Sequence, residues 1–142
     1  MRIRHLFTPG HIGPYADICL FLFRICIALF MLTHGIPKLE KLIDGGEIKF
    51  ADPFGIGMAP SLALTVFAEV FCSILILLGL ATRLACIPLI ITMLVAVFIA
   101  HSGMAFEKKE LASIYLVIYI ILLVFGAGKY SIDSLISKRL NG

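Results

Sequence analysis

Glu69 interrupts an otherwise apolar stretch of about twenty residues, from Ser61 to Leu80, whose remaining members are apolar or small. A helix of this length is long enough to cross a lipid bilayer. A carboxylate near the middle of such a helix costs about 2.5–3.5 kcal/mol on insertion scales unless it is paired, protonated or in contact with water. The sequence therefore predicts a membrane protein in which neighbouring helices supply a partner for Glu69.

Three further apolar stretches of similar length accompany this one. A chain that is 61% hydrophobic, with a mean hydropathy of +1.06, is too apolar for a soluble domain of this size. The predicted fold is an all-α integral membrane four-helix bundle, running up-down-up-down, with a long and partly helical first loop. The predicted spans lie at about 17–34, 61–80, 84–101 and 111–127, in a membrane domain 17–135 between polar tails at 1–16 and 136–142.

Charges and cysteines exclude several other classes of protein. The formal net charge of +3 includes no basic block, so we expect no binding to nucleic acid. Basic residues in the short loops favour both termini on the cytoplasmic side. The four cysteines lie in or beside apolar stretches and are interpreted as small hydrophobic residues. The alternative is a redox pair of Cys19 and Cys26, but a disulfide cannot form between them within one helix, because their Cα atoms would be about 10 Å apart.

Ionisable residues of different spans fall at compatible depths when a helix rises 1.5 Å per residue. By this estimate Arg24 and Glu69 differ by roughly 6 Å in depth, which a guanidinium can bridge. Polar faces of membrane helices normally point into the bundle. The predicted polar pocket, which is the candidate site, comprises Arg24, His34, Lys38, Glu69, His101, Glu110 and Tyr115.

Several of these residues can also be interpreted as having a purely structural role. Arg24 and Glu69 would then form an ion pair that only fixes helix packing, and the two histidines would bind loop carbonyl groups. Lys38 would extend along the membrane surface as an interfacial residue, and it shares a face with Arg24 only if the helix continues past Pro37. No metal site is predicted, because the histidines lack the local spacing of metal ligands.

Several motifs together resemble the DoxX family of small four-span membrane proteins. They are Arg24, Thr33–Leu39, Glu69, Leu78–Arg83, His101, Glu110–Ala112 with Tyr115, and Gly126–Asp133. Many relatives have Gly-Pro-Gly where this chain has Gly126-Ala127-Gly128. The resemblance implies a multi-pass bundle in a bacterial inner (plasma) membrane. The family takes its name from the membrane subunit of a thiosulfate:quinone oxidoreductase, so quinone-linked redox chemistry is the activity that the resemblance suggests.

Two functions from different classes follow. In the first, the chain is a membrane subunit that binds a quinone in its polar pocket, with a membrane or soluble redox protein as its partner. Because the sequence contains no evident electron carrier, that partner or the quinone must supply one. In the second, the chain is a non-enzymatic conduit for protons or small solutes, or an assembly partner in a membrane complex. The sequence leaves open whether the chain is an enzyme and whether it forms a homo-oligomer.

Overall fold

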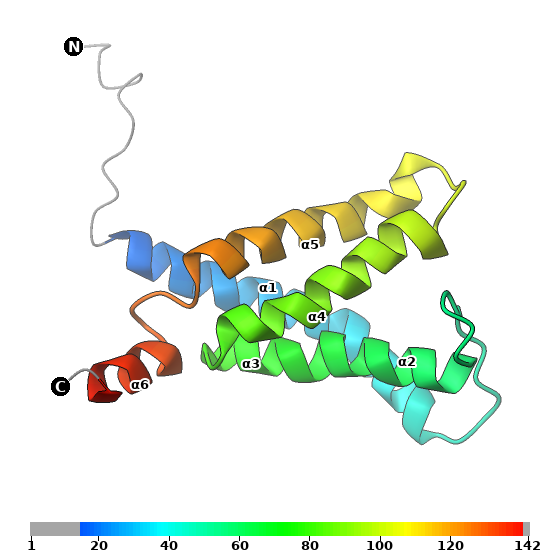
Figure 1. The fold of residues 1–142 in the computed structure, drawn as a ribbon, viewed down its shortest axis with the longest axis horizontal. Coiled ribbons are helices and arrows are strands. Elements are labelled where there is room, and N and C mark those ends of the chain that lie inside the picture. Colours follow the sequence, from blue (N-terminus) through cyan, green and yellow to red (C-terminus); the bar gives the residue numbers. More distant parts are fainter. Residues whose placement is uncertain (1–14, 141–142) are drawn as a thin grey trace, which may run out of the picture.

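The computed structural model describes residues 15–140, and its regular structure in this range is entirely helical. The all-helical prediction is thus confirmed for these residues, whereas most of the predicted tail 1–16 lies outside them. The helices follow one another along the chain, with a long loop over residues 44–57 between the first two and shorter links between the later ones (Figure 1). They are α1 (Tyr15–Ile43), α2 (Met58–Val66), η2 (Phe67–Cys72), α3 (Ser73–Leu78), α4 (Thr82–Val95), η3 (Ala96–Ala100), α5 (Phe106–Phe125) and α6 (Ile132–Leu140).

Three of the helical segments in the described part of the chain are long and apolar enough to cross a membrane. They are Tyr15–Ile43, Met58–Leu78 and Thr82–Ala100. Large hydrophobic side chains cover their outer faces, and Phe30 and Phe98 are 60% and 68% exposed. A soluble protein would not present so much apolar surface to water, whereas lipid chains cover it without cost. The chain is therefore a membrane protein whose outer surface contacts lipid.

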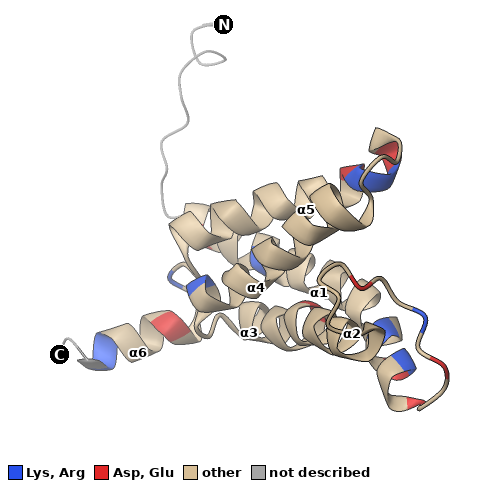
Figure 2. Cartoon of the chain, turned by 45° about the vertical axis from the view of Figure 1, so that its right-hand side comes forward, with Lys and Arg blue, Asp and Glu red and all other residues tan. Residues whose placement is uncertain are grey.

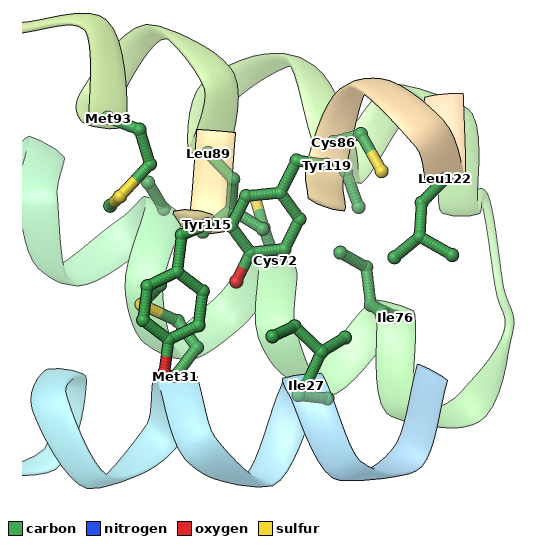
Figure 3. Packing of buried hydrophobic residues seen from close by; sticks show 13 residues of the cluster. Ile27, Met31, Cys72, Ile76, Cys86, Leu89, Met93, Tyr115, Tyr119 and Leu122 are labelled. Carbon is green, nitrogen blue, oxygen red and sulfur yellow. The ribbon is translucent and has the colours of Figure 1, made fainter. Parts of the chain in front are cut away.

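The helices pack in two closely associated groups. One group joins α4 to α5, and the other joins α1 to the continuous segment α2–η2–α3. Between them lies a core of buried side chains in which Tyr119, Leu89 and Ile76 are fully enclosed (Figure 3). Charged residues lie mainly towards the ends of the helices, which leaves long stretches without them (Figure 2).

Helix α1 continues to Ile43, although proline at position 37 removes one backbone donor. The first span predicted from the sequence ends at about residue 34, before Pro37. Contacts on both sides of the proline account for the difference. Gly35 packs against the Glu69 backbone, and Lys38, one residue after the proline, forms an ion pair with Glu69. Tertiary contacts on both sides of Pro37 thus stabilise the helix where one backbone hydrogen bond is missing.

The loop between α1 and α2 is closed by Asp52. Its carboxylate accepts hydrogen bonds from the backbone N–H groups of Ile56 and Gly57, at 3.0 and 2.9 Å, and from the Ser61 hydroxyl at 2.9 Å. These bonds fix the start of α2. They lower the pKa of Asp52 even though desolvation acts in the opposite direction.

Candidate functional site

Glu69 is paired with Lys38. The Lys38 ammonium lies 2.5 Å from one carboxylate oxygen and 2.6 Å from the other. The Glu69 side chain is only 4% exposed, whereas that of Lys38 is 32% exposed. The acid is therefore enclosed by protein, and its cation extends from the pair to the molecular surface. This is the partner that a carboxylate in an apolar helix requires.

A glycine makes this pairing geometrically possible. At Gly35, one turn before Lys38 on α1, an added Cβ would lie 2.8 Å from a Val70 side-chain carbon and 3.0 Å from the Glu69 carbonyl group. Contacts this short would force the two helices apart. Gly35 thus lets α1 approach the backbone of Glu69, which brings the lysine within reach.

The helix that carries Glu69 is locally irregular. Residues Phe67–Cys72 form a π-helical turn between α2 and α3, and Glu69 lies inside it. Such turns widen a helix and change the direction of the side chains that follow, and they are frequent at functional sites. The apolar sequence around Glu69 gives no sign of this turn.

Aromatic rings connect the ion pair to the core. His34 of α1 makes an edge contact with the ring of Tyr115 on α5, with ring centroids 6.0 Å apart. The Tyr115 ring stacks on that of Tyr119, also at 6.0 Å. Glu69 is close enough to both tyrosines to interact with them electrostatically. His34 is exposed, so this aromatic series extends from the outer surface of α1 to the centre of the protein.

Two buried hydroxyl groups end the series. The Tyr119 hydroxyl is directed into the core beside Cys72 (Figure 3). Ser73 lies close enough to interact with it, but neither hydroxyl has a hydrogen bond of regular geometry to a described residue. Leaving such groups without partners in an apolar core costs about 1–3 kcal/mol each. The arrangement is a polar site surrounded by apolar packing.

Arg24 lies elsewhere, and the expected pairing of Arg24 with Glu69 is wrong. The Arg24 guanidinium donates to the carbonyl oxygens of Ala127 and Tyr130, at 2.9 Å in the second case. It is 1% exposed and lies over the Phe21 ring. Estimates of depth from helical rise placed Arg24 near the acid, but they contain no information about the segment after α5, which supplies its partners.

Asp133 is a structural carboxylate that the predicted set did not include. It accepts hydrogen bonds from the backbone N–H groups of Ala81 and Thr82, at 2.7 and 3.0 Å, and so caps the start of α4. Its own N–H donates to the Gly79 carbonyl. Asp133 therefore ties α6 to the turn between α3 and α4. A sequence signal existed in the turn itself, because a short Gly-containing link exposes N–H groups that need an acceptor.

The remaining predicted site residues are less closely connected to the pair. The His101 ring binds the Ala96 carbonyl oxygen within its own helix end, at 2.7 Å. Glu110 is exposed and makes no ion pair or hydrogen bond within residues 15–140. In the same range no three His, Cys, Asp or Glu side chains lie close enough together to hold a metal ion. The structure thus brings together Lys38, Glu69, His34 and Tyr115.

Comparisons with known proteins agree with the resemblance seen in the sequence. The protein-family model described as DoxX matches residues 19–102 of this chain. An uncharacterized membrane protein of Mycobacterium tuberculosis is 33% identical, over 89% of this chain and 85% of its own length. Two uncharacterized proteins of Haemophilus influenzae are 27% and 29% identical, and the alignments cover 89% and 92% of this chain and 88% and 99% of the relatives. No solved structure matches the chain significantly.

Proposed function

The chain belongs to the DoxX family, and from this premise we propose that it is a four-span membrane subunit whose Lys38–Glu69 pair binds the polar head of a quinone. The proposal rests on one observation, namely that the Lys38 side chain is much more exposed than that of Glu69. Glu69 is enclosed and holds the ammonium in place, while Lys38 reaches the surface. An ammonium has three N–H donors, so one remains for a ligand after the two carboxylate oxygens are bound.

His34 supplies a second polar group beside the first. It precedes Lys38 by four residues on the same helix, so both side chains lie on one face, one turn apart. The His34 ring is exposed and makes no hydrogen bond to another described residue. A quinone carries two carbonyl acceptors on a flat ring, which matches a lysine and a histidine next to the Tyr115 ring. A lipid-soluble ligand would reach this face from the bilayer.

The chain's own part is binding and orientation. Glu69 fixes the position of the ammonium, Lys38 and His34 hold the carbonyl oxygens, and Tyr115 supports the His34 ring. Electrons come from a redox partner protein in this proposal, because the sequence shows no carrier. The chain would then act as the quinone-facing subunit of a complex in the bacterial inner membrane.

Four spans with both termini on the cytoplasmic side complete the proposal. From Leu111 to Phe125, helix α5 contains no charged residue, and its only charges lie in its first five residues. A fourth span beginning after Glu110 would place these charges at the membrane surface. Labelling of single cysteines, introduced at Ser137 and Ser102 in a cysteine-free background, with a membrane-impermeant reagent tests this topology. Reaction of both sites from the same side of sealed vesicles would contradict it.

Quinone binding is tested with a short-chain ubiquinone analogue and the purified protein in lipid nanodiscs. We expect Lys38→Met combined with Glu69→Gln to weaken binding about tenfold or more, because a hydrogen bond from a charged donor is worth about 1.5–3 kcal/mol. The double substitution leaves no unpaired buried charge. Lys41→Met is the matched control, since Lys41 lies one turn further along and binds the Lys49 carbonyl oxygen. Unchanged affinity in the double variant would refute the proposal.

Proton conduction is a second candidate, favoured by the two unpartnered hydroxyl groups near Glu69. Acids inside membranes often mark proton routes, and Tyr119 and Ser73 lie deeper in the protein. Fully buried Leu89, Ile76 and Leu122 surround them, so the described core offers no continuous polar route. Proton flux into liposomes that falls on Glu69→Gln would favour conduction over quinone binding.

A further inference from the structure

A groove with cations at its rim runs between α1, α3 and α6, at the opposite end of the protein from the Lys38–Glu69 pair. It is open and has a volume of about 630 Å³. Among the residues that the structure describes, three cations, Arg24, Lys129 and Lys138, line it, and no carboxylate does. Side chains such as Phe21, Leu77 and Leu135 form its apolar walls.

Arg24 adds a buried positive charge to this groove. Two of its guanidinium nitrogens bind carbonyl oxygens, which are uncharged, and its Nε is buried without a hydrogen-bond partner among the described residues. Asp133 is an electrostatic neighbour, but its two oxygens accept from the backbone of α4. The three cations of the described groove lining outnumber this one neighbouring carboxylate, and the excess of positive charge favours an anion in the groove.

Helix α6 places the groove at the level of a membrane surface. It projects from the end of the bundle (Figure 1), with cations near its free end (Figure 2). Leu135 and Ile136 on this helix are 61% and 43% exposed. A short helix with exposed apolar side chains and terminal basic residues is typical of an element lying along the lipid interface. Contacts of Asp133 with the α3–α4 turn hold it there.

We propose that this groove binds an anionic phospholipid. The phosphate group would lie between Lys129 and Lys138 above the Arg24 guanidinium, and the acyl chains would follow the apolar walls formed by Phe21 and Leu77. Both parts of the groove, the cationic rim and the apolar sides, are complementary to a lipid of this kind. Two acids lie near this segment but are not among the described lining residues. Asp133 binds the backbone of α4, and Asp17 accepts from the Lys129 backbone N–H at 3.3 Å.

The experiment titrates the delipidated protein, in mild detergent, with phosphatidylglycerol or phosphatidylcholine and measures bound lipid by native mass spectrometry. The wild type is expected to prefer phosphatidylglycerol. Lys129→Gln with Lys138→Gln should weaken phosphatidylglycerol binding by about fivefold for each lysine, with phosphatidylcholine unaffected. Lys108→Gln with Lys109→Gln removes the same charge at the far end of α5 and should leave binding unchanged.

A second variant tests whether the lipid binds in the groove itself or is attracted only by the surface charge. Leu135→Trp fills the groove without changing charge and should abolish the preference for phosphatidylglycerol, whereas Ile91→Trp, on the exposed face of α4, should preserve it. Equal losses in the two double-lysine variants would overturn the proposal. Displacement of the lipid by millimolar inorganic phosphate would also overturn it, because the site would then recognise free phosphate. Quinone binding is measured at Lys38 and is independent of these results.

Discussion

Buried charges occur at both ends of the helical protein, but their partners differ in kind. At one end, Lys38 and Glu69 neutralise each other through side chains of two helices. At the other end, Arg24 binds backbone carbonyl groups and Asp133 binds backbone N–H groups, so each charge holds a chain segment in place. We call these the ion-pair end and the clamp end.

The difference shows that a charge buried in an apolar protein can serve two purposes. An ion pair is self-contained, so replacing both members by apolar residues is often neutral or stabilising. A charge bound to the backbone cannot be removed so easily, because the peptide groups that it satisfies remain. The ion-pair end is therefore free to serve a ligand, whereas the clamp end determines how the last helix is attached.

The largest expected effects come from removing single charges. Lys38→Met should lower the free energy of unfolding by about 3–5 kcal/mol, because it leaves the Glu69 carboxylate buried without a cation. Adding Glu69→Leu to the same protein should restore most of that loss. Unfolding of the purified protein in mixed detergent micelles measures both. If the double variant were as unstable as the single one, the pair would not be self-contained.

At the clamp end, a second substitution should not restore the stability that the first one removes. Arg24→Leu should also cost several kcal/mol, since it leaves the carbonyl groups of Ala127 and Tyr130 without their donor. Adding Asp133→Leu should increase the loss, because that carboxylate satisfies different backbone groups. The same unfolding assay applies. Rescue by the second substitution would show that these two residues act mainly as an ion pair.

Substitution of a glycine at either end should lower the free energy of unfolding by less than the loss of a single charge. Gly79→Ala places a Cβ 2.7 Å from the Ser131 Cβ and requires an alanine at a φ of +68°. We expect a loss of about 3 kcal/mol from overpacking and left-handed backbone strain together. Gly35→Ala should cost about 1–3 kcal/mol from overpacking alone.

Gly46→Ala is the control for both glycines, because no atom of the described residues lies within 4 Å of its added Cβ. If the pair binds a quinone as proposed above, the Gly35→Ala variant should also weaken that binding, since the two helices that carry Lys38 and Glu69 would move apart. A Gly35→Ala protein as stable as the Gly46→Ala protein would argue against the close approach of these helices. Melting temperature and unfolding free energy are the measurements.

Removal of the Asp133 cap alone should have a moderate effect. Asp133→Ala leaves two N–H groups at the start of α4 without an acceptor, and loss of such a cap typically costs about 1–2 kcal/mol. Asp44→Ala, at an exposed loop carboxylate with no side-chain hydrogen bond among the described residues, should change stability by less than about 0.5 kcal/mol. Comparison of the two unfolding curves measures the contribution of the clamp.

The smallest change in stability is expected for a substitution of Asp52, which belongs to neither the ion-pair end nor the clamp end. Hydrogen bonds in the folded loop lower the pKa of Asp52 below the ordinary value of 3.8, against the effect of desolvation. A carboxyl with a lowered pKa stabilises the fold above its unfolded pKa, and this stabilisation is lost as the pH falls through the folded pKa. Asp52→Asn should therefore reduce the dependence of stability on pH below about 4. An unaltered acid titration of stability would contradict this assignment.

The sequence predicted several features of these two ends and missed others. It identified Glu69 as an acid in need of a partner, because the polarity of one residue in an apolar stretch can be read directly. It chose Arg24 as that partner from helical depth, whereas Lys38 has this role. Depth gives a position along the membrane normal, but the pairing also depends on helix rotation and spacing, which Gly35 and the continuation of α1 past Pro37 determine.

By itself, the sequence determined that this is a helical membrane protein of the DoxX family with a carboxylate enclosed in an apolar segment. These are local properties, since the length and polarity of each stretch fix whether it can form a helix in lipid. Only the tertiary structure decided that Lys38 neutralises Glu69 and that Arg24 and Asp133 secure the last helix. Both results depend on contacts between segments distant in the chain, because a charge in a medium of low polarity binds whichever group the packing brings within hydrogen-bond distance.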